Sequence, residues 1–325
     1  MSALTRLDFP DQLRMTRIYT NNEELNKMGA QTSERGTLPQ VEEKYGTLRF
    51  PDAPEDRPYV YGVLVLSADG RMAFEDVPVG PYIARKNEPD PEGGLLDFWT
   101  LIMLRAHADG IITAAKTLRA EPEASLHICD RRLIRERKQW LGKRSTHPLQ
   151  IVLSRQGTGI PYEHVLFGHL ENEELGYLVV TAAQGAERIR SECPLQVREI
   201  KLEKESDLKK MDLLGEILEE KNPQVMPVLT AGARCGEVDS RLLMKGLRRL
   251  GIKTLGIESP TVAYHLMNEQ MLDEYFLNYA MLFAGGSIAP GRYQPFRHDS
   301  HPHSSLLSVS MHGPHFLYTR HRLLY

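Results

Sequence analysis

The sequence predicts an α/β fold with a mostly parallel central sheet flanked by helices, and three observations point to it. From residue 58 onward, short β-branched runs such as YVYGVLVLS and GIIT alternate with segments of helical periodicity. Several of these runs are apolar throughout, which is typical of strands buried on both faces. Two further runs, SLLSVSMH and HFLYTRH, close the chain and predict antiparallel strands at the C-terminus.

The strands and helices follow one another in a regular order. Strands are expected at 59–67, 110–113, 149–154, 176–181, 196–202, 226–231, 252–258, 273–286, 305–312 and 315–321. Helices are expected near 94–108, 184–191, 207–221, 239–250 and 260–271. Two helices have clear boundaries: Asp239 is an N-cap with Gly251 just past the helix end, and Ser259 and Pro260 open the last helix.

The chain divides into a short N-terminal extension and one large domain. Its 325 residues, 41% of them hydrophobic, suffice for a well-buried core. Residues 1–57 are polar, contain scattered proline and glycine and show weak periodicity, so we expect an irregular extension wrapped on the main body. Residues 58–325 form the main domain.

Composition excludes several classes of protein. The formal net charge is only -3, so a broad electrostatic grip on nucleic acid or on an anionic membrane is not expected. The three cysteines lie far apart without a CxxC pair, which argues against a disulfide framework and a zinc knuckle. No apolar run approaches the ~18 residues needed to span a bilayer. We therefore expect a cytoplasmic protein without an export signal or membrane anchor.

Residues 130–148 form a basic segment with two interpretations. The segment holds seven Lys/Arg against two acids and could meet phosphate. Its amphipathic spacing also predicts a solvated helix face with an apolar underside of Leu133, Ile134, Trp140 and Leu141, which is the common case and the one we favour.

Histidines gather near the C-terminus. Six of the twelve lie from His298 onward, including the run HDSHPH. Imidazole and carboxylate groups are good zinc or nickel ligands, so a metal site is conceivable. Spacing on a loop fixes no geometry, however, and we expect a polar loop before the last hairpin and no metal.

The turns that follow the parallel strands are the places to look for a ligand, because ligands bind beyond the carboxyl ends of such strands. In VLSADGRMA, Asp69 either faces a ligand or only forms a turn with Gly70. In GIITAAKTLRAEP, Thr113 and Thr117 flank small alanines that would let a ligand approach closely, although a capped helix start would look the same.

The turn IVLSRQGTG has the residues that recognise a phosphate on an adenosine ribose. Arg155 offers a fork of donors to a dianion, and Ser154 adds one more. An exposed arginine in a loop is an equally good interpretation of this turn. The chain has no GxGxxG fingerprint, so a two-half Rossmann dinucleotide site is not supported.

Taken in order, these turns resemble the reductase domain of riboflavin biosynthesis, which has the dihydrofolate reductase fold. The segments that carry the resemblance are RPYVYGVLVLSADGRMA, LRAHADGIITAAKTLRAEP, QIVLSR, YLVVTAA, LDEYFLNYAMLFAGG and FLYTRHR. They match the family patterns in order from about Arg57 to Tyr325. Several co-linear motifs are more specific than any one of them.

The resemblance implies an activity and a set of site residues. Reductases of this family bind NADPH and transfer hydride to the ribose C1′ carbon of 5-amino-6-(5-phosphoribosylamino)uracil. By resemblance, Asp69 and Glu258 lie at the substrate and nicotinamide end. Thr113 and Thr117 border the cofactor, and Ser154 with Arg155 receives the 2′-phosphate.

Two departures from the family pattern weaken the expected cofactor site. Relatives read EGGP where this chain has Glu258, Ser259, Pro260 and Thr261, so two glycines that would donate to a pyrophosphate are missing. Proline supplies no N–H, and both new residues add a Cβ. In the other turn, Ala114 replaces a glycine and Lys116 brings a long cation, which could pair with phosphate directly or point to solvent.

Three functions follow from these observations. The first is an NADPH-dependent reductase of a pyrimidine-like or pterin-like small molecule. The second is a non-catalytic relative that uses the cleft or a dimer surface for binding or regulation, and the third is a reductase with an altered substrate. No HxE with a following PCxxC occurs, so a fused zinc deaminase is excluded. The long C-terminal strands suggest a homodimer formed through sheet edges.

Overall fold

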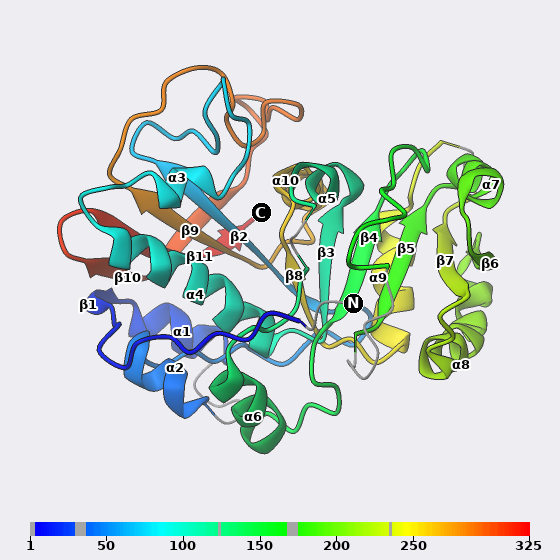
Figure 1. The fold of residues 1–325 in the computed structure, drawn as a ribbon, viewed down its shortest axis with the longest axis horizontal. Helices are drawn as coiled ribbons and strands as arrows, with labels where there is room; N and C mark the ends of the chain where they lie inside the picture. The colour runs from blue at the N-terminus through cyan, green and yellow to red at the C-terminus, as the bar shows by residue number, and fades with distance from the viewer. Residues whose placement is uncertain (1–3, 30–36, 123–124, 168–174, 234–235) are drawn as a thin grey trace.

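A computed structural model describes residues 4–29, 37–122, 125–167, 175–233 and 236–325. It contains one sheet of 11 strands in the order β1-β10-β11-β9-β2-β8-β3-β4-β5-β7-β6 (Figure 1). The strands are β1 (Thr16–Thr20), β2 (Tyr59–Ser67), β3 (Gly110–Ala114), β4 (Leu149–Leu153), β5 (Tyr177–Thr181), β6 (Gln196–Leu202), β7 (Val225–Ala231), β8 (Thr254–Ile257), β9 (Glu274–Ala280), β10 (His303–His312) and β11 (Phe316–Leu324).

The sheet is parallel over most of its width. Every neighbouring pair from β9 across to β6 is parallel, whereas β11, β10 and β1 are added antiparallel beside β9. The carboxyl ends of the parallel strands therefore share one edge of the sheet, the upper edge in Figure 1. The predicted fold class, a mostly parallel sheet with antiparallel C-terminal strands, is confirmed.

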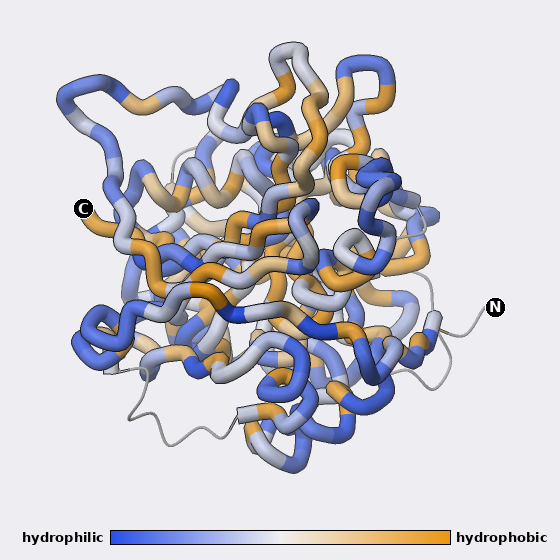
Figure 2. Tube along the Cα trace, turned by 90° about the vertical axis from the view of Figure 1, so that its left-hand side faces the viewer, coloured by the Kyte–Doolittle hydropathy of each residue, from blue (hydrophilic) through white to orange (hydrophobic). Residues whose placement is uncertain are grey.

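Helices cover both faces of the sheet. They are α1 (Asn22–Lys27), α2 (Pro39–Lys44), α3 (Tyr82–Arg85), α4 (Pro91–His107), α5 (Ala115–Ala120), α6 (Arg131–Trp140), α7 (Ala183–Glu192), the 3-10 helix η1 (Glu205–Lys210), α8 (Met211–Glu220), α9 (Ser240–Arg249) and α10 (Pro260–Asn268). Ile111 of β3 belongs to the core cluster that includes α4 and α6, whereas Ile112 points to the opposite face and belongs to the cluster that includes α8, α9 and α10. A third cluster joins α5 and α7 to β4, β5 and β7. In Figure 2, hydrophobic segments of the trace lie mostly toward the middle of the molecule and hydrophilic segments mostly toward its outside.

Two observed element boundaries differ from those predicted from the sequence. Helix α4 begins at Pro91, three residues before the expected start, because the Asp90 side chain accepts from the Gly93 N–H and caps the helix. Strand β9 ends at Ala280 and not at residue 286, because its pairing with both neighbours stops there: Ala280 is level with Ser67, the last residue of β2, and with Phe316, the first residue of β11.

The N-terminal extension is more regular than expected, which corrects that prediction. Strand β1 pairs with β10, and Leu38 and Val41 are fully buried in the core beneath α4. Lys44 is also buried, and its ammonium donates to the carbonyls of Pro10, Asp11 and Leu13. The helices α1 and α2 have only six residues each, too few to show a helical period in the sequence.

The basic segment forms helix α6, but its underside differs from the expectation. Leu133 is buried as predicted, whereas Trp140 is 48% exposed and Arg137 is fully buried. The guanidinium of Arg137 donates to the carbonyls of Ala106 and Ala108, at 2.7 and 2.6 Å, in the last turn and at the C-cap of α4. A cation is favourable there, so the buried side of α6 is partly charged.

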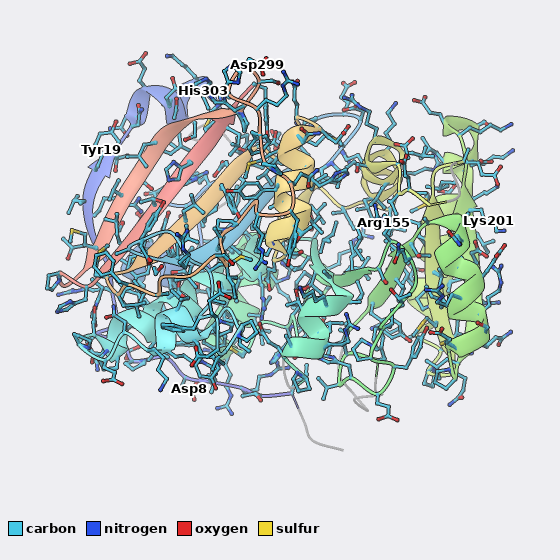
Figure 3. All side chains as sticks on the ribbon, turned by 90° about the horizontal axis from the view of Figure 1, so that it is seen from above. Asp8, Tyr19, Arg155, Lys201, Asp299 and His303 are labelled. Atoms are coloured by element: carbon cyan, nitrogen blue, oxygen red, sulfur yellow. The ribbon has the colours of Figure 1, made fainter. Side chains whose placement is uncertain are left out.

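The sheet edges are not where the sequence placed them. Strand β1 covers the outer side of β10, so the long C-terminal strands are internal and the outermost strands are β1 and β6. Figure 3 shows Tyr19 on β1 at one end of the sheet and Lys201 on β6 at the other. Strand β11 is paired on both sides, and β1 pairs with Ser308 to Met311 of β10, so a dimer through the full edge of β10 would have to displace β1.

Two kinds of feature are absent from the described ranges. No helix there is long and apolar enough to cross a membrane. No group of three or more His, Cys, Asp or Glu side chains in the same ranges has the geometry of a metal site.

Candidate functional site

Four strand ends bring most of the predicted site residues into one row. Ile257 of β8 is level with Ile112 of β3, and Leu153 of β4 is level with Ala114 of β3 and with Val180 of β5. The residues that follow these strands therefore lie side by side along the upper edge of the sheet. They include Glu258, Thr113 to Thr117, and Ser154 with Arg155.

Glu258 is held in one orientation by Arg105 of α4. The Nε and Nη2 groups of Arg105 donate to the two carboxylate oxygens, each at 2.7 Å. The side chains of Arg105 and Glu258 are only 7% and 10% exposed. The backbone N–H of Glu258 donates to Ile112 at 2.9 Å, which fixes the residue beside Thr113. A bidentate pair of this kind restricts both side chains strongly.

The third guanidinium nitrogen of Arg105 also forms hydrogen bonds. Its Nη1 donates to the carbonyls of Ser125 and His127, at 3.2 and 3.1 Å. The His127 ring in turn hydrogen-bonds the Thr5 carbonyl at 2.9 Å. The N-terminal extension is thereby attached to the segment whose carbonyls bind Arg105. The sequence analysis did not single out Arg105, although it is the arginine of the LRAHAD motif.

Thr113 presents a polar atom without a partner. The residue is fully buried at the end of β3, and its Oγ1 makes no hydrogen bond with any described residue. A buried hydroxyl without a partner is costly, so a ligand or water that bonds to it would be favoured. Ala114 is the N-cap of α5 and has no side chain that could cap it, and Thr117 is half-buried one turn further on.

The turn after β8 is a helix start with little room for a phosphate. Ser259 is the N-cap of α10 and is only 3% exposed, and Pro260 is the first helical residue. The Ser259 side chain caps no helical N–H, and Thr261 is exposed. Pro260 has no N–H to donate, so this turn fits a pyrophosphate less well than a glycine pair would.

Arg155 lines a pocket of about 310 Å³ beyond β4 and β5. The other lining residues are Gln156, Gln184, Gly236 and Glu237. Ser154 does not line the pocket: its side chain is nearly buried, and its Oγ donates to the Thr158 carbonyl at 3.1 Å. The structure thus places the arginine at a pocket and the serine inside the loop. Figure 3 shows Arg155 above the carboxyl ends of the strands.

Two glycines set the shape of the Arg155 loop. Gly157 has φ 66°, and a Cβ there would lie 2.2 Å from the Gly185 carbonyl oxygen. A Cβ on Gly185 would lie 2.0 Å from Thr181 Oγ1 and 2.9 Å from the Arg155 carbonyl oxygen. The loop after β4 therefore packs backbone to backbone against the first turn of α7, which fixes Arg155 at the pocket.

Asp69 lies away from Glu258. Strand β2 is level with Ile257 at Gly62, and it continues five residues, roughly 17 Å, to Ser67 before the turn that holds Asp69. The Asp69 carboxylate accepts from the Ser67 hydroxyl and from the N–H groups of Ala284 and Gly285. These hydrogen bonds lower the pKa of Asp69 to about 2. Asp69 therefore organises the turn after β9, and it does not meet Glu258 in this structure.

Lys116 forms no ion pair with a described acid, and its ammonium lies near an aromatic ring. The side chain is exposed, and its Nζ lies 5.7 Å from the centroid of the Tyr293 ring. Tyr293 belongs to the loop between β9 and β10, drawn in orange at the top of Figure 1. The sequence had assigned no role to this loop.

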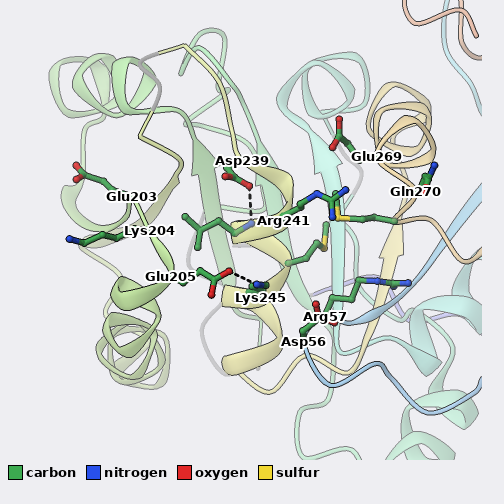
Figure 4. A pocket seen from close by; sticks show the side chains of 13 residues that line it. Asp56, Arg57, Glu203, Lys204, Glu205, Asp239, Arg241, Lys245, Glu269 and Gln270 are labelled. Atoms are coloured by element: carbon green, nitrogen blue, oxygen red, sulfur yellow. Dashed lines mark hydrogen bonds and ion pairs between the residues drawn. The ribbon is translucent and has the colours of Figure 1, made fainter.

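The larger pocket, about 440 Å³, involves none of the predicted site residues. It lies beside α9, between η1, the end of α10 and the residues before β2 (Figure 4). The ion pair between Glu205 and Lys245 and the Asp239 cap on Leu242 lie within it. It is lined by both acids and bases, and its charged groups already bind one another in part. The row of strand ends is the better candidate site.

Comparisons with known proteins identify the fold. Neither the family models nor the sequences of curated proteins give a match to this chain. Among solved structures, a pyrimidine reductase-like protein from Corynebacterium diphtheriae is 19% identical, with 89% of this chain and 99% of that chain covered and a TM-score of 0.55. RibD from Acinetobacter baumannii, form 1, is 15% identical, with 88% and 61% covered and a TM-score of 0.53.

A longer protein shows the same likeness. The diaminohydroxyphosphoribosylaminopyrimidine deaminase/5-amino-6-(5-phosphoribosylamino)uracil reductase from Thermotoga maritima is 15% identical, with a TM-score of 0.53, and the match covers 83% of this chain and 58% of that one. The chain thus spans about three fifths of this protein and of the Acinetobacter RibD. It has the fold of the pyrimidine reductases of riboflavin biosynthesis, as the sequence motifs predicted.

Proposed function

We propose that the protein is an NADPH-dependent reductase of a pyrimidine-like small molecule. The observation that carries this proposal is the row of strand ends, where a fixed carboxylate, an unpartnered buried hydroxyl and an arginine-lined pocket follow adjacent strands of a reductase fold. Fold alone does not decide function, so the argument depends on these residues.

Each part of the row suits one part of the cofactor. The exposed guanidinium of Arg155 can bind the 2′-phosphate, since an arginine fork matches a dianion. The Thr113 hydroxyl can donate to a group that reaches the end of β3. When bound, NADPH supplies a hydride, and the protein has to align donor and acceptor carbons.

Glu258 is the residue we propose for the reacting end. The Arg105 fork fixes its two oxygens, so the carboxylate keeps one position when a substrate arrives. A preorganised carboxylate stabilises positive charge that develops on the carbon that accepts the hydride. We assign Asp69 to the substrate end through the Ala284–Gly285 turn that its carboxylate holds.

A second candidate function is a non-catalytic binding protein with the same fold. The start of α10 favours it, because Pro260 removes an N–H where a pyrophosphate would need one. A third function is a reductase with an altered substrate. Such a protein would bind the cofactor, as the first function requires, but it would not reduce the riboflavin intermediate.

The deciding experiment is a titration of the purified protein with NADPH and NADH, followed by calorimetry and nicotinamide fluorescence. We expect saturable binding with NADPH preferred. Arg155→Ala should lower the preference by about tenfold or more, the loss of roughly one charge-assisted hydrogen bond to a phosphate. Arg188→Ala, an exposed arginine of α7 outside the pocket, is the matched control. Absence of binding at millimolar NADPH would reject the reductase and leave the binding protein.

We also propose that the protein acts in the cytosol as a homodimer. Its mass in solution, measured by light scattering, checks the oligomeric state, and a value near the 36.9 kDa of one chain would reject the dimer.

A further inference from the structure

The loop between β9 and β10 carries an exposed aromatic ring that two cations share. The centroid of the Tyr293 ring lies 5.7 Å from Lys116 Nζ and 4.8 Å from Arg292 Cζ. The ring itself is 63% exposed. Lys116 and Arg292 are thus separated by no more than about one Debye length at 0.1 M salt, roughly 10 Å, so their charges repel each other appreciably.

The two cations have no close carboxylate partner among the described residues. Within that part of the chain, neither Lys116 nor Arg292 forms an ion pair. Glu75 interacts with Arg292 at longer range, so its carboxylate, which accepts from the Ser287 N–H on the same loop, offsets only part of the positive charge. By contrast, Arg297 of this loop is paired with Asp299 at 2.9 Å.

The loop is fixed next to the row of strand ends. Phe296 stacks on Tyr264 of α10 with ring centroids 5.6 Å apart, and Gln294 hydrogen-bonds His265 at 3.3 Å. Gly291 lies so close to Tyr264 that a Cβ there would come within 2.3 Å of its ring. The loop that carries Tyr293 therefore packs against α10, and Tyr293 contacts Lys116 in the first turn of α5. The turns before these two helices are the ones in which other residues replace the glycines of the family pattern.

We propose that Lys116, Tyr293 and Arg292 form a binding site for the phosphate or pyrophosphate group of a ligand that lies beside the row of strand ends. Two neighbouring cations, neither of them in an ion pair with a described acid, attract a dianion, and Arg292 adds a planar fork that matches phosphate oxygens. The site supplies positive charge where the Ser259–Pro260 turn supplies fewer N–H donors. The proposal rests on the proposed function for the identity of the ligand, which is either the cofactor through its pyrophosphate or a phosphorylated substrate.

The test compares three probes on the same variants. Inorganic pyrophosphate, ribose 5-phosphate and NADPH are titrated by calorimetry into the wild type, Lys116→Gln, Arg292→Gln and the control Arg297→Gln. Arg297→Gln removes one positive charge from the same loop away from Tyr293. We expect wild-type pyrophosphate binding that weakens about tenfold in Lys116→Gln and in Arg292→Gln and less than about twofold in Arg297→Gln. The affinity should also fall as salt is raised.

The outcomes separate the ligand sources and the two proposals. Weaker NADPH binding in Arg292→Gln assigns the site to the cofactor, whereas weaker ribose 5-phosphate binding with NADPH unchanged assigns it to the substrate. If the wild type does not bind NADPH but binds pyrophosphate through Arg292, the proposed function fails and the phosphate site stands. If no probe binds, or if Arg292→Gln and Arg297→Gln behave alike with every probe, the phosphate site is rejected, whatever NADPH does.

Discussion

Arg105 binds Glu258 through both carboxylate oxygens at 2.7 Å, across 153 residues of sequence. The pair joins α4 to the end of β8, and the third nitrogen of the same guanidinium holds the carbonyls of Ser125 and His127. One buried arginine thus fixes the candidate catalytic carboxylate and the segment that contacts the N-terminal extension.

Removing Arg105 should destabilise the protein strongly. Arg105→Ala leaves Glu258 buried without its partner, so we expect a loss of about 3–5 kcal/mol in the free energy of unfolding. Arg105→Lys keeps the charge but cannot span two oxygens and two carbonyls, and it should fall between alanine and wild type. Urea unfolding measures both. The control is Arg198→Ala, whose exposed pair with Glu220 should contribute only about 0–1 kcal/mol. A loss in Arg105→Ala no larger than that of the control would contradict the structural role of the pair.

Thr113→Val should separate stability from cofactor binding. Its hydroxyl is buried without a partner, so the isosteric valine should stabilise the unliganded protein by about 1 kcal/mol. The same change should weaken NADPH binding by about tenfold if the hydroxyl donates to the cofactor. Thr319→Val is the contrasting variant, because Thr319 Oγ1 donates to the Leu277 carbonyl at 2.6 Å and its loss should be destabilising. Unchanged NADPH affinity in Thr113→Val would remove Thr113 from the cofactor site.

Asp97 should make stability depend on pH in the range near neutrality. Burial between α4 and β9 raises the pKa of this carboxyl from 3.8 to about 6, although Asn278 donates to it at 2.7 Å. The folded state therefore favours the protonated acid. This contribution to stability is fully present below about pH 4 and is lost as the pH rises through about 6.

Asp97→Asn should remove that dependence. Between pH 4 and pH 7 the variant should gain roughly 2 kcal/mol over the wild type in the free energy of unfolding. Urea unfolding at several pH values provides the measurement, with exposed Asp76→Asn as the control. Parallel pH profiles for wild type and Asp97→Asn would mean that the carboxyl does not titrate in this range.

The sequence was informative wherever a signal is local. Apolar runs and the turn residues after them predicted the parallel strands and the order of the candidate turns. The fold class was predicted from the order of these segments along the chain. Arg105 was missed because its partner is distant in the chain, and no spacing rule connects an arginine in a helix with a glutamate after a later strand. Tyr293 was missed for the same reason, since nothing local shows that its loop returns to Lys116. Strand β1 was missed because its five residues gain a partner only when β10 is in place.

Restoring two glycines at the start of α10 should strengthen cofactor binding at a cost in stability. Ser259→Gly with Pro260→Gly returns an N–H and removes two Cβ atoms from the space a phosphate would use. The glycines also gain freedom in the unfolded chain, so the free energy of unfolding should fall by about 1–2 kcal/mol.

The control for that double variant is Pro91→Gly, which removes the matching first-turn proline of α4. It should lose comparable stability without any gain in NADPH affinity, measured by calorimetry. A gain of about tenfold in the double variant alone would mean that Ser259 and Pro260 weaken a real pyrophosphate site. Equal NADPH affinity in the double variant, Pro91→Gly and the wild type would mean that the pyrophosphate does not contact this turn, and that the start of α10 is only a helix cap in this protein.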